Sequence, residues 1–304
     1  MKGIFMTIRH LKIFIAVAET GKMGLAAKQL YIAQPTVSQV IADMEDAYGV
    51  KLFERLSKKL YITEEGIQLL SYARHIVTLF DEMERNLRNA SSHILLRVGA
   101  TITVGSCVLA GIIKRYEEQR TNAQVQVFVD NTRLIEKMLL ESELDLALVE
   151  GSIQSPELLV QPVMEDELVL VCSVNHPFAG RKMVYAEDLK GQNFILREEG
   201  SGTRALFEHY LLQHGVEIHP KWVCHSSDSI LNAVCGGQGL TVISRLLVQN
   251  GIKAGKLCIL PLEDARLTRN FNSVYHKNKF LSPALTDFIA ELEHTSFQNS
   301  PCLA

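Results

Sequence analysis

Residues 24–39 decide how the amino-terminal part of the chain folds, and they read Gly24-Leu25-Ala26-Ala27-Lys28-Gln29-Leu30-Tyr31-Ile32-Ala33-Gln34-Pro35-Thr36-Val37-Ser38-Gln39. The apolar positions over 24–30 predict one buried side of a short helix. After a three-residue connection, a second helix is expected to begin at Gln34, because Pro35 in a first helical turn loses no hydrogen bond. Val37, Ile41 and Met44 continue its inner stripe, and Gly49 ends it. Two helices joined so closely predict a helix–turn–helix.

The flanking segments extend this motif on both sides. Residues 8–19 carry apolar positions at helical spacing, so a further helix is expected before the motif. On the other side, residues 51–55 lead into a basic turn, Leu56-Ser57-Lys58-Lys59, and then into a short strand, Leu60-Tyr61-Ile62. The order predicts a winged helix–turn–helix with a small two-stranded wing.

A long helix is expected next. Thr63-Glu64-Glu65-Gly66 resembles a cap with acidic residues in the first turn. Beyond it, apolar residues follow one another at alternating spacings of four and three: Leu69, Ala73, Ile76, Phe80, Met83 and Leu87. This heptad spacing favours a helix that pairs with a second copy. One buried helix of a globular domain would show the same pattern.

From Ile94 onward, strand and helix patterns alternate in two similar rounds, which predicts parallel sheets covered on both faces. Residues 158–163 and 168–174 are expected to be two separate strands. The second round is closed by a late strand and helix. We therefore expect two lobes joined by two crossing segments, near 164–167 and 262–268.

The charge is distributed unevenly over the 304 residues. The net formal charge is −3, but residues 1–63 carry +4, residues 64–92 carry −2 and residues 93–304 carry −5. A basic head on an acidic body is the pattern expected when one module binds a polyanion. No run approaches the ~20 apolar residues of a membrane span. The first ten residues lack the apolar stretch and the cleavage site of a secretory leader, so secretion is not expected, and Met6 is an alternative start. The six scattered cysteines are expected to be buried small hydrophobes.

The chain resembles the LysR-type transcriptional regulators. The resemblance is dense over residues 8–66, where it rests on Arg9-His10-Leu11-Lys12-Ile13-Phe14, Ala26-Ala27-Lys28-Gln29-Leu30, Ala33-Gln34-Pro35-Thr36-Val37-Ser38, and Leu52-Phe53-Glu54-Arg55 with Thr63 and Gly66. It implies a winged helix–turn–helix (α with a small β wing) over 1–63 and a dimerising linker helix over 64–92. The remainder would be an α/β two-lobe effector domain of the periplasmic-binding-protein type. Its lobe I is expected over 93–164 and 268–304, and its lobe II over 165–267.

The resemblance also implies the DNA contacts. Groove contacts fall on Gln34, Pro35, Thr36, Ser38 and Gln39, and backbone or minor-groove contacts on Arg55 and Lys58. The chemistry agrees, since glutamine can address adenine in bidentate fashion and a threonine methyl can contact the thymine methyl. The alternative is a capped helix with solvated polar residues. The family's phosphate-contacting Ser/Thr loop is here Gly21-Lys22-Met23-Gly24, so Lys22 or backbone N–H groups would have to substitute.

Later residues resemble the regulators of sulfur assimilation and related anion metabolism. The matching strings are Arg197-Glu198-Glu199-Gly200-Ser201-Gly202-Thr203-Arg204, Val149-Glu150-Gly151 and Asp166-Glu167-Leu168. Glycines that enter a helix expose N–H groups where the helix dipole favours an anion. Other hydroxyl-bearing turns follow strands at Thr101-Ile102-Thr103 and Ser226-Ser227, where α/β sheets bind ligands.

We therefore predict an effector site for a small anion. Its residues would be Thr101, Thr103, Ser201, Gly202, Thr203 and Ser226, with unpaired hydroxyls and no buried carboxylate facing the ligand. Helix capping is the alternative for each turn. Arg204 would either pair with the anion or form a salt bridge to Glu198 or Glu199.

Together these patterns predict a cytoplasmic, sequence-specific DNA-binding transcriptional regulator, with no catalytic site, metal or cofactor. The expected partners are double-stranded promoter DNA, a small anionic effector and further copies of the chain in a dimer or tetramer. RNA polymerase is a further candidate partner, and no membrane is involved. The rival class is a solute-binding protein or an enzyme on the same bilobal scaffold. The absence of a leader argues against the first, and the absence of a catalytic constellation argues against the second.

Overall fold

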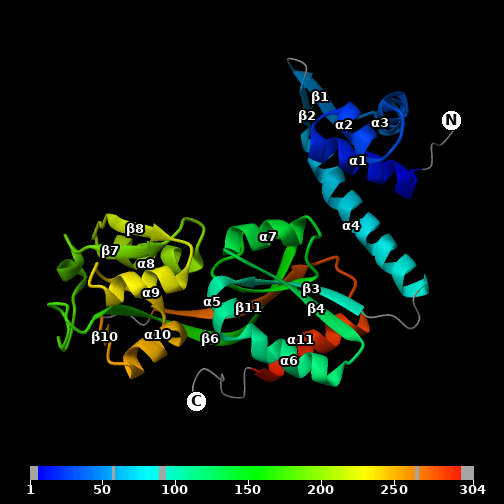
Figure 1. Ribbon diagram of the computed structural model, residues 1–304. Helices are drawn as coiled ribbons and strands as arrows, with labels where there is room; N and C mark the ends of the chain where they lie inside the picture. Colours follow the sequence, from blue (N-terminus) through cyan, green and yellow to red (C-terminus); the bar gives the residue numbers. More distant parts are fainter. Residues whose placement is uncertain (1–5, 57–58, 89–93, 264–266, 296–304) are drawn as a thin grey trace. The chain divides into compact units, whose positions relative to one another are not determined.

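The computed structural model describes residues 6–56, 59–88, 94–263 and 267–295. It divides into two compact units, whose boundary falls between Ser92 and His93. Figure 1 labels their helices and strands. Among the described residues, no helix combines the length and the apolar character that a bilayer span requires.

The first unit is a winged helix–turn–helix, as predicted. Its elements are α1 (Ile8–Thr20), α2 (Met23–Gln29), α3 (Gln34–Tyr48), β1 (Phe53–Leu56), β2 (Lys59–Ile62) and α4 (Glu64–Arg88). Gly21 and Gly49 end α1 and α3 in the left-handed conformation that glycine adopts at little cost. Phe14, Val17, Ala26 and Val37 are fully buried where the first three helices meet. Strands β1 and β2 pair antiparallel, with Phe53 opposite Ile62.

Glu45 fixes the segment that leads from α3 into the wing. Its Oε1 accepts the backbone N–H groups of Leu52 (2.9 Å) and Phe53 (3.2 Å), and its Oε2 lies 2.7 Å from Lys51 Nζ. Burial acts to raise the pKa of Glu45, but the hydrogen bonds from Lys51 and the two backbone groups outweigh it and lower the pKa. The carboxylate therefore stays ionised and holds the base of the wing.

Helix α4 divides its apolar residues between two roles. It begins as predicted, because Thr63 Oγ1 accepts the N–H of Gly66 at 3.0 Å. Leu69 and Ala73 pack into the hydrophobic core of the first unit and are not left available to pair with a second copy of the helix. Farther along α4, the exposed apolar side chains form a stripe that we call the α4 stripe: Tyr72, Ile76, Leu79, Met83 and Leu87.

The second unit contains two lobes. Lobe I holds β3 (Ile94–Thr101), α5 (Ile102–Cys107), α6 (Leu109–Gln119), β4 (Ala123–Asp130), α7 (Thr132–Leu140), β5 (Leu146–Glu150) and α11 (Pro283–Thr295). Strand β3 pairs in parallel with β4 and β5. Helix α7 packs on one face of these strands, while α6 and α11 lie side by side on the other (Figure 1).

Lobe II is built in the same layered way. It holds η1 (Ala186–Leu189), β7 (Phe194–Arg197), α8 (Gly202–Gln213), β8 (Pro220–Cys224), α9 (Ser227–Cys235), β9 (Thr241–Ser244), α10 (Arg245–Lys253) and β10 (Leu257–Leu260). Phe194 and Phe207 are buried in one hydrophobic core of the lobe, and Ile195 and Ile230 are buried in the other. The sequence patterns did not predict α10, β10 or η1.

Two long strands run through both lobes. They are β6 (Leu158–Ser173) and β11 (Leu267–His276), which pair antiparallel with a bulge between Phe271 and Asn272. The predicted parallel pairing is present between β3 and β4, β3 and β5, and β7 and β8, whereas the crossing strands join antiparallel. The split of 158–174 into two strands was wrong. The polar residues 165–167 lie inside β6, because this strand pairs with β11 up to Leu168 and continues with β9 and β10.

Candidate functional site

The first two turns of α3 present a polar surface. Gln34, Pro35, Thr36 and Gln39 are exposed and Ser38 is partly exposed, whereas Val37 is fully buried. Gln39 Nε2 donates to Asp43 Oδ1 at 2.7 Å, one helical turn farther on. Arg55 is exposed on β1, and Lys58 lies outside the described residues. The geometry leaves five side chains of one helix end available to a partner.

The turn before α3 carries a feature that the sequence patterns missed. Tyr31 has φ 56° and is 95 % exposed. A bulky residue in the left-handed region is uncommon and costs free energy. Lys22, in the other loop of the motif, is exposed and begins α2 without a side-chain cap.

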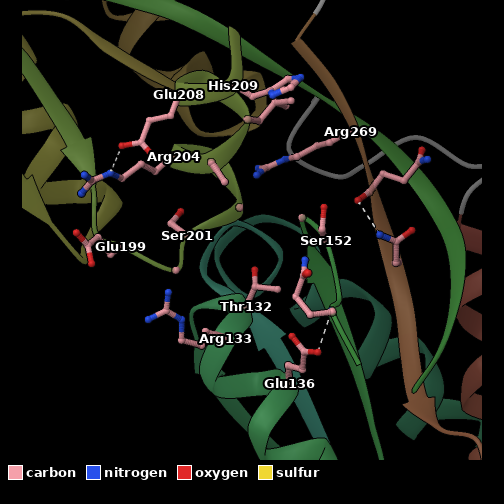
Figure 2. A pocket seen from close by; sticks show the side chains of 18 residues that line it. Thr132, Arg133, Glu136, Ser152, Glu199, Ser201, Arg204, Glu208, His209 and Arg269 are labelled. Carbon is pink, nitrogen blue, oxygen red and sulfur yellow. Dashed lines mark hydrogen bonds and ion pairs between the residues drawn. The ribbon is translucent and has the colours of Figure 1, made fainter. Parts of the chain in front are cut away.

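A pocket of about 1000 Å³ opens between the two lobes of the second unit. Figure 2 shows its walls: Thr132, Arg133 and Glu136 come from α7, Ser152 follows β5, and Ser201, Arg204 and Glu208 come from the start and the first turns of α8. Arg269, Asn270 and Asn272 of β11 also line the pocket. Both lobes and one crossing strand therefore contribute to a single cavity.

Two of the predicted effector residues line this pocket, Ser201 and Gly202. Ser201 stands at the N-terminus of α8 and is 3 % exposed, yet its hydroxyl caps no backbone group and has no hydrogen-bond partner among the described residues. A buried hydroxyl without a partner is costly. Because Ser201 lines the pocket, its hydroxyl is available to a molecule that enters it.

Three other predicted residues, Thr101, Thr103 and Thr203, lie deeper and are all buried. Their hydroxyls are paired, contrary to expectation. Thr101 Oγ1 accepts the N–H of Glu150 at 3.1 Å, and the hydroxyls of Thr203 and Thr103 accept from Arg269 at 2.9 and 3.4 Å. Thr103 also belongs to α5 rather than to a turn.

Ser226 and Arg204 take local roles in the structure. Ser226 is exposed and caps α9, where its hydroxyl accepts the N–H of Ser229 at 3.3 Å, and it is not among the residues that line the pocket. Arg204 pairs with Glu208, one turn along α8, at 2.7 Å. The expected partner Glu198 is instead held by Arg197, with two contacts of 2.8 Å.

The expectation that no carboxylate is buried near the site was also wrong. Glu150, Asp166 and Glu198 are all buried. Burial acts to raise the pKa of Glu198, but the hydrogen bond and charge of Arg197 outweigh it and lower the pKa. Each buried carboxylate is paired with an arginine, as low dielectric surroundings require.

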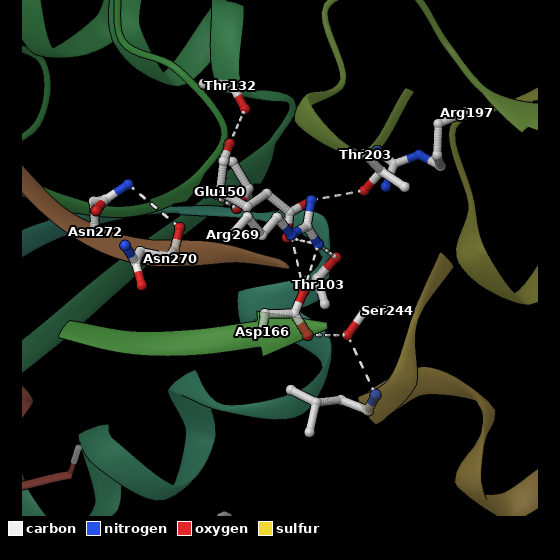
Figure 3. Close-up of polar contacts among 12 residues, drawn as sticks. Thr103, Thr132, Glu150, Asp166, Arg197, Thr203, Ser244, Arg269, Asn270 and Asn272 are labelled. Carbon is white, nitrogen blue, oxygen red and sulfur yellow. Dashed lines mark hydrogen bonds and ion pairs between the residues drawn. The ribbon is translucent and has the colours of Figure 1, made fainter. Parts of the chain in front are cut away.

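Arg269 is the residue that sequence reasoning missed, and Figure 3 shows it at the centre of the polar contacts between the lobes. Its Nε donates to Asp166 Oδ2 at 2.8 Å, its Nη1 to Thr203 at 2.9 Å, and its Nη2 to Glu150 Oε2 at 3.0 Å. The side chain is 6 % exposed. Arg269 stands directly opposite Asp166 in the β6–β11 ladder, so the antiparallel pairing of the two crossing strands is the signal that would have revealed it.

The fold is that of a known family. Residues 8–67 match the model described as bacterial regulatory helix-turn-helix protein, lysR family, and residues 90–296 match the LysR substrate binding domain. The chain is a member of the LysR family of transcriptional regulators, which are not enzymes.

Relatives extend over nearly the whole chain. The regulator YeiE of Escherichia coli is 31 % identical over 93 % of this chain and 96 % of its own. The regulator CysL of Bacillus subtilis is 28 % identical over 87 % of this chain and 89 % of its own. Both are HTH-type transcriptional regulators, as predicted.

Solved structures share the fold. A full-length OxyR variant from Pseudomonas aeruginosa has a TM-score of 0.69 at 20 % identity, covering 98 % of this chain and 97 % of its own. The regulatory domain of CcmR from Synechocystis, solved in complex with 2-PG, has a TM-score of 0.64 at 24 % identity, covering 67 % of this chain and 98 % of its own.

Proposed function

We propose that this regulator binds promoter DNA through α3 and is controlled by a small anionic metabolite held between its two lobes. The DNA part is supported by the exposed polar first two turns of α3 and by the basic charge of residues 1–63. An α-helix fits the major groove, where glutamine and threonine side chains can read base edges. Because its partner is chromosomal DNA, we place the protein in the cytoplasm, as a dimer or tetramer.

The observation that carries the effector part is the buried hydroxyl of Ser201 at the N-terminus of α8, which has no hydrogen-bond partner in the described part of the chain. Helix N-termini favour negative charge, and Arg133, Arg204 and Arg269 line the same pocket. The CcmR domain, which shares the fold, was solved with 2-PG, a phosphorylated and therefore anionic molecule. An anion between the lobes would favour one lobe closure and so alter how the heads engage DNA.

The test uses the full chain in two stages. An operator is first selected from random duplexes, and its affinity is measured by fluorescence anisotropy. The chain is then screened by thermal shift against sulfate, phosphate, 2-phosphoglycolate, a set of cationic metabolites and a set of neutral metabolites. The operator affinity is measured again in the presence of each compound. We expect one class of anions to stabilise the protein and to change DNA binding. An effector that proved cationic, or that bound equally well to Ser201→Ala, would contradict the anion site.

A further inference from the structure

The polar centre between the lobes already holds an internal cation. The guanidinium of Arg269 contacts Glu150 and Thr103 of lobe I, Thr203 of lobe II and Asp166 of the crossing strand β6 (Figure 3). All four partner side chains are almost completely buried. An arginine in this place presents several N–H donors in a planar fork that matches carboxylates and phosphates.

The two carboxylates around Arg269 are held differently. Asp166 is fixed, because its Oδ1 also accepts the Ser244 hydroxyl at 2.6 Å and its strand position lies directly opposite Arg269. Glu150 is held less firmly. Within the part of the chain that the structure describes, only Arg269 donates to the Glu150 carboxylate. Glu150 is therefore the partner that Arg269 can exchange.

Arg269 also borders the open pocket, together with Ser201, whose hydroxyl is unpartnered within the residues that the structure describes. An anion that enters the pocket thus meets a donor without a partner and a guanidinium whose charge is already neutralised by Glu150 and Asp166. Binding to Arg269 requires that one of these carboxylates give way.

We propose that Glu150 is a built-in competitor of the effector: its carboxylate occupies Arg269 in the free protein, and an incoming oxyanion takes its place. This inference rests on the proposed function. It assigns to the effector a carboxylate, phosphate or similar oxyanion group that accepts hydrogen bonds from the guanidinium and from Ser201. The competition sets the affinity, because each binding event must break the Glu150–Arg269 pair.

The same exchange reaches the contact between the lobes. The backbone carbonyl of Glu150 accepts the Thr132 hydroxyl at 2.6 Å, and the next residue, Gly151, abuts Gly202 of lobe II. A movement of Glu150 therefore acts on the point where the two lobes touch. Displacement of Glu150 from Arg269 therefore couples effector binding to lobe closure.

The experiment measures the affinity of the full chain for sulfate and for 2-phosphoglycolate by calorimetry. Glu150→Gln removes the competing charge but keeps the shape, so we expect the anion to bind about tenfold more tightly, the effect of one charge-assisted hydrogen bond. Arg269→Gln should abolish binding. Glu199→Gln is the matched control, because Glu199 is an exposed glutamate of the same pocket without a contact to Arg269, and it should change the affinity less than about twofold.

The outcomes separate this inference from the proposed function. If neither anion binds the wild type or any variant, the anionic effector fails. If the anion binds the wild type but Glu150→Gln binds equally or more weakly, or if Glu199→Gln tightens binding as much, the competitor role is overturned. Glu150→Asp, which keeps the charge on a shorter side chain, should fall between the wild type and Glu150→Gln. If neither Glu150 variant folds, Glu150 is a structural partner of Arg269 and the inference is also overturned.

Discussion

Gly151 of lobe I and Gly202 of lobe II are in direct backbone contact. A Cβ built on Gly202 would lie 2.8 Å from the Gly151 Cα and 2.7 Å from the Glu150 carbonyl oxygen, distances that real Cβ atoms do not show. Gly151 has φ +95°, a conformation that other residues rarely adopt. The two lobes can therefore approach this closely only because both positions are glycine.

This contact predicts the effect of Gly202→Ala. We expect the variant to lose about 1–3 kcal/mol of stability, the usual cost of overpacking, or to separate the lobes. Urea unfolding measures the loss of stability, and amide exchange of residues 148–152 and 200–204 detects separation of the lobes. Gly236→Ala is the control, because its Cβ would meet ordinary contacts at 3.4 and 3.5 Å. Equal behaviour of the two variants would show that the glycine contact does not control closure.

The DNA-reading role of α3 predicts a difference between specific and non-specific binding. Gln34→Ala and Thr36→Ala should each weaken operator binding by about 1–3 kcal/mol and leave binding to random duplex nearly unchanged. Arg55→Ala should weaken both and reduce the slope of log K against log salt by about one. Anisotropy titrations over a salt series measure all three. An equal loss on operator and random DNA for Gln34→Ala would exclude base reading.

The strained turn before α3 predicts a stabilising substitution. Tyr31 holds a left-handed conformation with its ring almost entirely exposed, so the ring contributes little packing to offset the backbone cost. Tyr31→Asn should raise the melting temperature and stabilise the chain by up to about 1 kcal/mol, because asparagine tolerates this conformation better. If the operator affinity falls while the stability rises, the Tyr31 side chain contributes to DNA binding. A fall in stability would show that the left-handed conformation of Tyr31 does not destabilise the fold.

The features predicted correctly from the sequence are those encoded locally. The helix–turn–helix is specified within residues 24–49 by apolar spacing, Pro35 and Gly49, and the cap at Thr63 needs only the next three residues. The Arg269 site could not be found in this way, because its partners Thr203, Asp166, Glu150 and Thr103 lie 66 to 166 positions away in the chain. Only the register of β6 against β11 brings them together. The hydroxyls of Thr203 and Thr103, which looked unpaired in the sequence, accept from Arg269 for the same reason.

The α4 stripe predicts self-association. Its side chains follow heptad-like spacing and stay exposed, whereas Leu69 and Ala73 are used inside the head. Met83→Asp should lower the oligomer mass in analytical ultracentrifugation, because a charge would be buried in the pairing helix. Gln68→Asp, at an exposed polar position of the same helix, should sediment as the wild type does. If Met83→Asp keeps the parental mass, the stripe does not form the interface.

Asp145 predicts how the stability of lobe I depends on pH. Its carboxylate is 6 % exposed and lies 2.9 Å from Arg97 Nη2 and 2.7 Å from Lys279 Nζ. Burial acts to raise the pKa of Asp145, but Lys279 and Arg97 outweigh it, so the folded pKa lies below the ordinary value of 3.8. The carboxylate therefore stabilises the fold above pH ~4, and this stabilisation is lost as the pH falls through the folded pKa.

Asp145→Asn should cost about 3–5 kcal/mol at pH 7, because it removes the buried carboxylate that the nearly buried Lys279 shares with the partly exposed Arg97. The variant should also lose less stability than the wild type between pH 5 and pH 3, a window set by the lowered pKa. Urea unfolding across this pH range measures both effects. Asp287→Asn removes the half-exposed partner of Arg120 and should cost less than about 1 kcal/mol. If Asp145→Asn lost stability in acid as steeply as the wild type does, carboxylates other than Asp145 would account for the loss of stability at low pH.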